Sequence, residues 1–211
     1  LKISNFTGAF DKFFGSKLLS FAVMSTVCAV ASPVSLMLIR NHIGETISWD
    51  AAGYWQGMWY ISSTYLMVVT TTLSTYYMPR LSEIKDKAEM RLEIINGYKI
   101  LMPIVILSSL LVFICRELIV TILFSREFMP MLELFAFQLI GDVLKIASFL
   151  MAFLFWAKAM TRIFILSEIT FALLFVLFSW YFVNKFGLVG VTYAHALNYS
   201  VYLVFCDTPS I

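Results

Sequence analysis

Long apolar runs, each broken by a short polar cluster, fill the chain from one end to the other. The runs are continuous and do not alternate between apolar and polar residues, which excludes the pattern of a membrane β-barrel and predicts helices. Each run is about long enough to cross a hydrocarbon layer of roughly 30 Å. We therefore predict six transmembrane helices, near residues 16–39, 53–78, 98–115, 132–156, 163–183 and 188–206.

The composition places the chain among integral membrane proteins. Hydrophobic residues make up 61% and charged residues 13% of the 211 positions, whereas an ordinary soluble domain has about 45–50% and 25%. Six spans leave no room for a separate soluble domain, so we predict an all-α membrane protein that is one unit over residues 1–206. The three cysteines stand far apart without metal or redox spacing, and we expect them to be buried apolar side chains.

Lysine and arginine residues are unequally divided between the two sides of the predicted membrane. Ten fall on the side that holds both chain ends, namely Lys2, Lys12, Lys17, Arg80, Lys85, Lys87, Arg91, Lys99, Lys158 and Arg162. Four fall on the other side, namely Arg40, Arg116, Arg126 and Lys185. Because the cytoplasmic loops of membrane proteins carry an excess of lysine and arginine, we predict that both ends are cytoplasmic. The segment 80–97 is expected to form a short surface helix, and 116–130 to lie along the outer face.

The two ends of the chain suggest a piece of a longer protein. Residue 1 is leucine, and the tail 207–211, "DTPSI", departs abruptly from the apolar run before it. We expect an artificial or truncated terminus there.

Signatures of a membrane enzyme are missing from the sequence. His42 and His195 stand alone, without an HExxH pair, and no G-x-S-x-G nucleophile elbow occurs. Gly8 and Gly15 are separated by six residues, whereas a phosphate loop has four between its glycines. We predict no catalytic residues, no metal site, no cofactor and no ATP hydrolysis.

Two opposite charges, Asp142 and Lys145, fall in the middle of the fourth predicted span. Each costs roughly 2.5–3.5 kcal/mol at the centre of a membrane helix, so their side chains must face away from lipid. They are three residues apart on one helical face, and Gly141 leaves room there for another helix or a polar ligand. Two interpretations stay open: an ion pair that fixes helix packing, or a hydrated cavity that both residues line.

Further polar residues fall at membrane depth in the neighbouring spans. Glu168 lies near the start of the fifth span, and Arg40 lies at the outer boundary of the first. Both could instead extend to the headgroups. His195 and Asn198 are three residues apart in the last span, where His195 is either a hydrogen-bonded packing residue or a proton relay.

Three stretches carry a resemblance to a known family. They are "SWDAAGYWQGMWYISSTYLMVVTTTLSTYYMPRLSE" (48–83), "LFSREFMPMLELFAFQLIGDVLKIASFLMAFLFWAKAMTRIFILSE" (123–168) and "GLVGVTYAHALNYSVY" (187–202). The chain resembles Wzx-type polysaccharide-lipid flippases, in the branch of O-antigen translocases and common-antigen lipid III flippases. This family belongs to the multidrug/oligosaccharidyl-lipid/polysaccharide exporter superfamily. The resemblance implies a twelve-helix, two-lobed exporter, of which this chain is the C-terminal lobe.

The resemblance also implies a substrate and roles for the buried charges. The substrate is an undecaprenyl-pyrophosphate-linked oligosaccharide, an O-antigen or common-antigen repeat unit, moved from the inner to the outer leaflet of the bacterial inner membrane. Arg40 and Lys145 are the candidates for binding the pyrophosphate, and Trp55 and Trp59 for stacking on sugars. Asp142 and Glu168 are the candidates for a proton or sodium site that drives alternating access.

The expected partners are membrane lipid, the missing N-terminal lobe and the polysaccharide polymerase machinery. Two other functions stay open. A cation-coupled multidrug exporter of the same superfamily should have an acidic cavity, whereas Asp142 and Glu168 are balanced here by Lys145 and Arg40. A membrane scaffold without transport would leave the cost of these charges unexplained.

Overall fold

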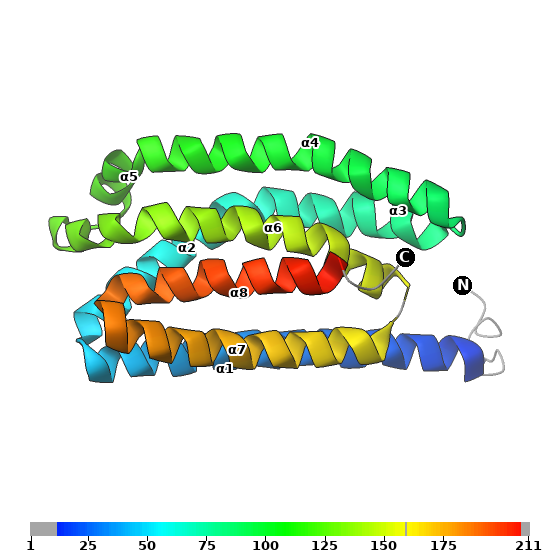
Figure 1. The fold of residues 1–211 in the computed structure, drawn as a ribbon, viewed down its shortest axis with the longest axis horizontal. Helices are drawn as coiled ribbons and strands as arrows, with labels where there is room; N and C mark the ends of the chain where they lie inside the picture. Colours follow the sequence, from blue (N-terminus) through cyan, green and yellow to red (C-terminus); the bar gives the residue numbers. More distant parts are fainter. Residues whose placement is uncertain (1–11, 159, 208–211) are drawn as a thin grey trace, which may run out of the picture.

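The computed structural model describes residues 12–158 and 160–207, and all regular structure in them is helical. The six long helices are α1 (Lys12–Thr46), α2 (Trp49–Thr72), α4 (Lys87–Ile114), α6 (Phe135–Ala157), α7 (Thr161–Phe186) and α8 (Gly190–Asp207). They run side by side along the long axis of the molecule (Figure 1). The all-helical class predicted from the continuous apolar runs is confirmed for the described residues.

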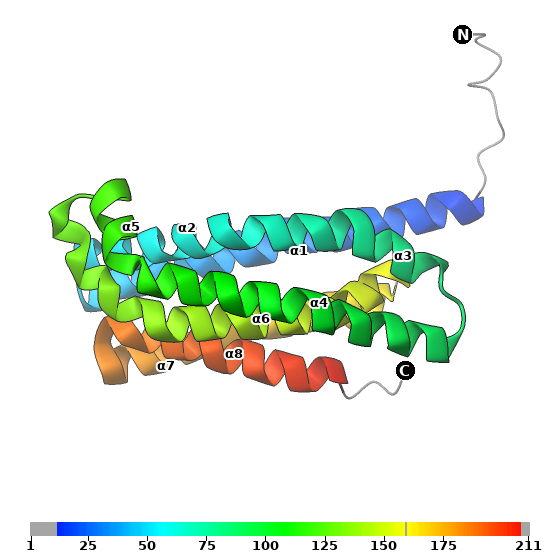
Figure 2. The same cartoon turned by 90° about the horizontal axis from the view of Figure 1, so that it is seen from above.

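Short elements join the long helices at the two ends of the bundle. The α1–α2 turn, α5 (Arg116–Leu123), the 3₁₀ helix Arg126–Leu134 and the α7–α8 turn gather at one end (Figure 1). Seen from above, α1 and α2 lie along one side, α7 and α8 along the other, and α4 and α6 between them (Figure 2).

Four helical stretches of the described chain are long and apolar enough to cross a membrane. They are Leu18–Thr46, Lys87–Ile114, Arg126–Ala157 and Thr161–Cys206. The last stretch contains both α7 and α8, and α2 is not among the four. α2 is rich in Ser, Thr, Tyr and Trp, which lowers its hydropathy. The protein is therefore a multi-pass membrane protein, and the count of six crossings stays a prediction.

The prediction of a separate surface helix at 80–97 is wrong. α2 continues through a π-helical turn, Leu73–Tyr77, into α3 (Met78–Glu83), and residues 84–86 then leave the helix. α4 begins at Lys87, where the Asp86 carboxylate caps it by accepting the Glu89 amide hydrogen bond at 2.9 Å. The charges at helical spacing thus belong to the first turns of a long helix.

α6 occupies the centre of the bundle. In the stretch Arg126–Ala157, which contains α6, 61% of the apolar part is buried inside the protein, against 11% for α4. Gly141 lets α8 approach α6 closely, because a Cβ atom at this position would clash with His195 Cδ2. The room that the sequence predicted beside Asp142 is therefore filled by a helix.

A tight turn places α8 beside α6. Gly187 adopts φ +67°, a left-handed conformation that favours glycine, and a Cβ atom at Gly190 would clash with the Phe182 carbonyl oxygen. Of the cysteines, Cys206 is buried, whereas Cys28 and Cys115 are half-buried. The predicted atypical tail beyond Asp207 lies outside the described residues.

Candidate functional site

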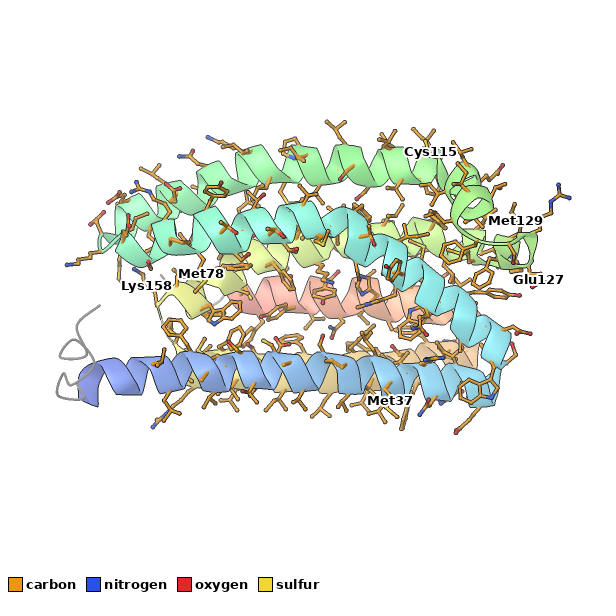
Figure 3. The ribbon with its side chains drawn as sticks, turned by 180° about the vertical axis from the view of Figure 1, so that it is seen from behind. Met37, Met78, Cys115, Glu127, Met129 and Lys158 are labelled. Carbon is orange, nitrogen blue, oxygen red and sulfur yellow. The ribbon has the colours of Figure 1, made fainter. Side chains whose placement is uncertain are left out.

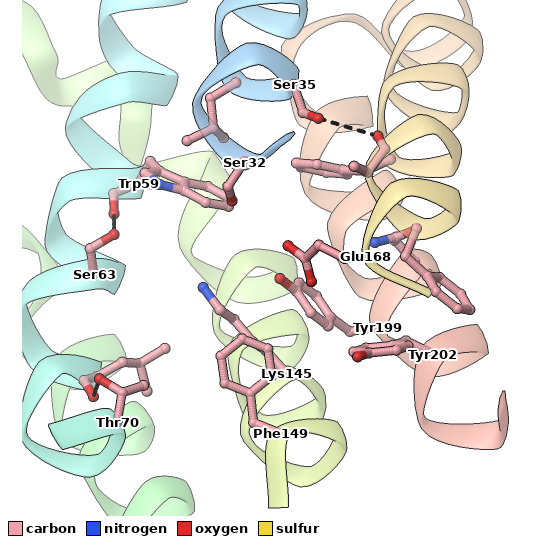
Figure 4. A pocket seen from close by; sticks show the side chains of 16 residues that line it. Ser32, Ser35, Trp59, Ser63, Thr70, Lys145, Phe149, Glu168, Tyr199 and Tyr202 are labelled. Atoms are coloured by element: carbon pink, nitrogen blue, oxygen red, sulfur yellow. Dashed lines mark hydrogen bonds between the residues drawn. The ribbon is translucent and has the colours of Figure 1, made fainter. Parts of the chain in front are cut away.

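A cavity of about 260 Å³, which we call the Lys145 cavity, opens between α1, α2, α6, α7 and α8. Aromatic rings and hydroxyl groups make up most of its wall, with one lysine and one glutamate (Figure 4). Its lining residues are Ser32, Ser35, Leu36, Trp59, Ser63, Leu66, Thr70, Lys145, Phe149, Glu168, Phe171, Ala172, Phe175, Asn198, Tyr199 and Tyr202. The cavity thus combines flat apolar surfaces with donors, acceptors and both signs of charge.

Aromatic rings surround the amine of Lys145. Its Nζ atom lies 5.1 Å from the ring centre of Trp59, 5.7 Å from that of Phe149 and 5.8 Å from that of Tyr199. These distances are those of cation–π contacts. Within the described chain, no carboxylate lies within 4.0 Å of this amine. The three N–H groups of Lys145 are therefore available to a ligand.

Acceptor groups face the same cavity from α7 and α8. Glu168 is half-buried, and Figure 4 shows it beside Lys145 and Tyr199. Asn198 is only 4% exposed, and its Oδ1 atom has no hydrogen-bond partner within the described chain. A buried acceptor without a partner is costly, so Oδ1 favours a ligand that donates a hydrogen bond.

Asp142 lies in a separate buried group, the Asp142 cluster, which comprises Asp142, His195, Tyr65, Gln138 and Ser109. Asp142 Oδ1 lies 3.1 Å from His195 Nε2 and 3.5 Å from Gln138 Nε2, and Tyr65 donates to Oδ2 at 2.9 Å. The Tyr65 hydroxyl also lies 3.1 Å from Ser109 Oγ. Asp142 and His195 are each at most 1% exposed, and neither lines the cavity.

Both interpretations of the charges on α6 need correction. The predicted ion pair is not formed, because Asp142 pairs with His195 on α8 and lies beyond ion-pair distance of Lys145. The predicted cavity is lined by Lys145 and Glu168 but not by Asp142. Residues three apart on a helix point in similar but not identical directions. Here Asp142 meets His195 on α8, whereas Lys145 faces the cavity.

A second cavity of about 430 Å³, the Arg40 cavity, lies between α1 and α2. Arg40, Asn41 and Gln56 provide its polar groups, and Trp55 provides an apolar wall. Trp59 and Leu36 line both cavities, so the two are neighbours along α1 and α2. The Trp55 indole Nε1 is buried without a partner in the described chain.

The sequence-predicted site residues thus fall into three places. Lys145 and Glu168 meet at the Lys145 cavity, Arg40 and Trp55 line the Arg40 cavity, and Trp59 lines both. Asp142 lies in the buried Asp142 cluster, outside both cavities. Sequence reasoning did not predict that Tyr65 and His195 bind Asp142. The cost of burying a carboxylate did indicate that Asp142 must have hydrogen-bond partners. The sequence could not identify Tyr65 and His195 as these partners, because they lie on other helices. No group of three or more His, Cys, Asp or Glu residues suited to a metal ion occurs in the described part of the chain.

Comparison with known proteins gives a clear relationship. Over 206 residues, 98% of its length, the chain is 32% identical to the curated Lipid III flippase of Escherichia coli (strain K12). The Lipid III flippase of Shigella flexneri matches with the same identity and coverage. No protein-family model matches the chain, and no solved structure gives a significant match. The chain spans about half the length of these curated relatives, since the match covers 50% of each. The chain belongs to the family of Wzx-type flippases to which these relatives belong.

Proposed function

We propose that this chain is one half of a flippase that moves an undecaprenyl-pyrophosphate-linked oligosaccharide from the inner to the outer leaflet of a bacterial inner membrane. The relatives are named for a lipid substrate, lipid III. A sugar headgroup with a pyrophosphate cannot cross hydrocarbon unshielded, because its polar groups would lose their hydrogen bonds to water. The polyprenyl tail needs no such shielding and stays in the lipid.

The observation that carries this proposal is the unpaired amine of Lys145 in a cavity at the centre of the bundle. An ammonium group without a carboxylate at bonding distance is suited to an anionic oxygen, and charge-assisted hydrogen bonds of this kind are strong. Asn198 Oδ1 and Glu168 supply acceptors for sugar hydroxyls, and the rings supply flat surfaces. A pyrophosphate-linked sugar has all the matching groups.

The exposed side of α2 supports a position against a second lobe. α1 and α2 form the near face of the molecule in Figure 3. On α2 the exposed residues include hydroxyl groups at Ser63, Thr64, Thr71 and Thr72, whereas the exposed residues over 100–114 of α4 are all apolar. We propose that this face turns towards the N-terminal lobe and the headgroup path, and that the chain is the C-terminal lobe of a two-lobed exporter.

Glu168 is our candidate for the residue that binds the coupling ion. It is the carboxylate that lines the Lys145 cavity, so a proton or a sodium ion can reach it from the same space as the substrate. Competition between the ion and the headgroup would bias alternating access in one direction. Asp142 lacks this access because protein atoms surround it.

Complementation of a flippase-deficient strain with the full-length protein tests the proposal. Lys145→Ala should reduce surface-glycan export at least tenfold, because a hydrogen bond to a charged group contributes about 1.5–3 kcal/mol. Lys185→Ala is the matched control, since Lys185 Nζ also lies over aromatic rings, Tyr181 and Phe186, but outside both cavities. Equal export by the two variants would contradict the proposal. Drug resistance without glycan export would indicate a multidrug exporter instead.

A further inference from the structure

His195 packs behind the aromatic wall of the Lys145 cavity without lining it. Its ring centre lies 5.4 Å from that of Trp59, 5.0 Å from that of Tyr199 and 5.8 Å from that of Phe175. The first two contacts are edge-to-face, with interplanar angles of 77°, a favoured geometry for aromatic rings. One buried imidazole therefore supports three of the rings that form the cavity wall.

Two of these rings also surround Lys145. Trp59 and Tyr199 each contact both His195 and the Lys145 amine. A displacement of the imidazole ring would thus move both Trp59 and Tyr199, and with them the Lys145 amine. His195 influences the cavity although it cannot touch a ligand there.

Asp142 holds the imidazole in place. A carboxylate only accepts hydrogen bonds, so His195 Nε2 donates to Asp142 Oδ1 at 3.1 Å. Tyr65 fixes the other carboxylate oxygen from α2. The ring also lies directly against Gly141, where no Cβ atom could fit. The position of the ring is therefore determined from two directions.

We propose that Asp142 and His195 are positioning residues for substrate binding at Lys145. Asp142 orients the imidazole, the imidazole orients Trp59 and Tyr199, and these rings hold the amine where it meets an anionic headgroup. This inference rests on the proposed function of the Lys145 cavity. In this proposal Asp142 accepts a hydrogen bond from His195 and does not exchange a coupling ion.

The first test reads the Trp59 environment and needs no ligand. The fluorescence of Trp59 in the purified full-length protein is isolated as the difference between a protein and its Trp59→Phe variant. Asp142→Ala and His195→Ala should shift this difference spectrum to longer wavelength, because the indole loses its packing and meets water. Asp142→Asn should leave it unchanged, since an amide oxygen still accepts from His195 Nε2. Ser179→Ala, which removes a buried hydroxyl that lines neither cavity, is the control.

Two variants keep the test decisive if an alanine variant does not fold. His195→Gln retains a donor for Asp142 but has no ring, so it should shift the Trp59 spectrum, whereas Asp142→Asn should not. An unchanged spectrum in both His195→Gln and Asp142→Ala would overturn the inference. An Asp142→Asn protein with normal Trp59 fluorescence but no glycan export would also overturn it, and would favour ion exchange at Asp142.

The second test uses inorganic pyrophosphate as the ligand. Its affinity for the full-length protein should fall about tenfold in Asp142→Ala and His195→Ala, as is typical when residues that orient a ligand-binding group are lost, and by less than about twofold in Asp142→Asn. Failure of the unsubstituted protein to bind pyrophosphate would contradict the proposed anion site. In that case the Trp59 spectra alone would test whether Asp142 and His195 position the rings of the cavity wall.

Discussion

Asp142 and Lys145 lie one turn apart on α6, and their surroundings are opposite. The carboxylate of Asp142 receives hydrogen bonds from three helices, through Tyr65 on α2, Gln138 on α6 and His195 on α8. The amine of Lys145 lies over three aromatic rings in the wall of a cavity, with no carboxylate within 4.0 Å in the described part of the chain. The role of a charge at membrane depth is therefore decided by its partners from other helices.

The energetic consequences of the two arrangements also differ. A buried carboxylate is tolerated when its oxygens are satisfied, and removal of one partner is then strongly destabilising. A lysine over aromatic rings gains roughly 0.5–2 kcal/mol from them, which leaves part of its desolvation cost unmet. An anionic ligand would offset that remainder. The Asp142 cluster is therefore expected to control stability, and the Lys145 cavity to control transport.

The largest effect should come from Gly141, where the two regions meet. Gly141→Ala places a Cβ atom in steric clash with His195 Cδ2, so α6 and α8 must separate. Overpacking of this kind costs about 1–3 kcal/mol or more, and we expect a lower melting temperature together with the loss of export. Gly53→Ala is the matched control because a Cβ atom there meets nothing, and alanine gains up to about 1 kcal/mol in a helix. Equal melting temperatures would contradict the close packing of α6 on α8.

Much of this arrangement could be predicted from the sequence. Continuous apolar runs predicted an all-helical protein, and the cost of membrane charges selected Lys145 and Glu168, which do line one cavity. Periodicity describes one helix at a time, however, and it cannot say which other helix faces a given residue. It therefore placed Asp142 with Lys145, whereas close packing at Gly141 brings His195 to the carboxylate instead.

The helix ends were less predictable for a related reason. Polar residues at 80–97 suggested a surface helix, but charges are tolerated in the first turns of α4, where Arg80 pairs with Glu89 at 3.3 Å and with Glu93 at 3.8 Å. In α2, hydroxyl groups bond to carbonyl oxygens of the preceding turn, as Ser63 does to Trp59 and Thr64 to Tyr60. Polar side chains of this kind continue a helix that hydropathy alone would shorten.

Glu168→Gln should give the next largest effect, confined to the cavity. The variant keeps the shape of the side chain and removes the group that would exchange an ion. We expect gradient-driven flipping in proteoliposomes to fall about tenfold, a loss of about 1.4 kcal/mol in the driven step, while exchange without a gradient persists. Glu133→Gln, an exposed residue outside both cavities, should behave as the unsubstituted protein. Gradient-driven flipping at the normal rate would exclude Glu168 as the coupling residue.

Arg40→Ala should have a smaller effect than either change. Arg40 is exposed and lines only the Arg40 cavity, so solvent weakens its attraction for an anion. An exposed charge contributes up to about 1 kcal/mol, and export should fall about threefold, measured as surface glycan at equal protein levels. Arg126→Ala removes an exposed arginine outside both cavities and is the control. A loss as large as that of Lys145→Ala would mean that the Arg40 cavity holds the pyrophosphate.

Tyr65→Phe should give the smallest effect on export, and it separates the two regions most cleanly. The change removes the hydroxyl that donates to Asp142 Oδ2 and lies beside Ser109, but it leaves the bond from His195 to Oδ1 intact. A hydrogen bond to a charged group contributes about 1.5–3 kcal/mol, so the melting temperature should fall by several degrees. Export should stay normal because the imidazole, and with it the wall of the Lys145 cavity, keeps its position. Tyr60→Phe, which removes an exposed hydroxyl from the same helix, should change neither quantity. A large loss of export by Tyr65→Phe at a normal melting temperature would place Tyr65 in the transport step, and the division between a structural cluster and a transporting cavity would then be wrong.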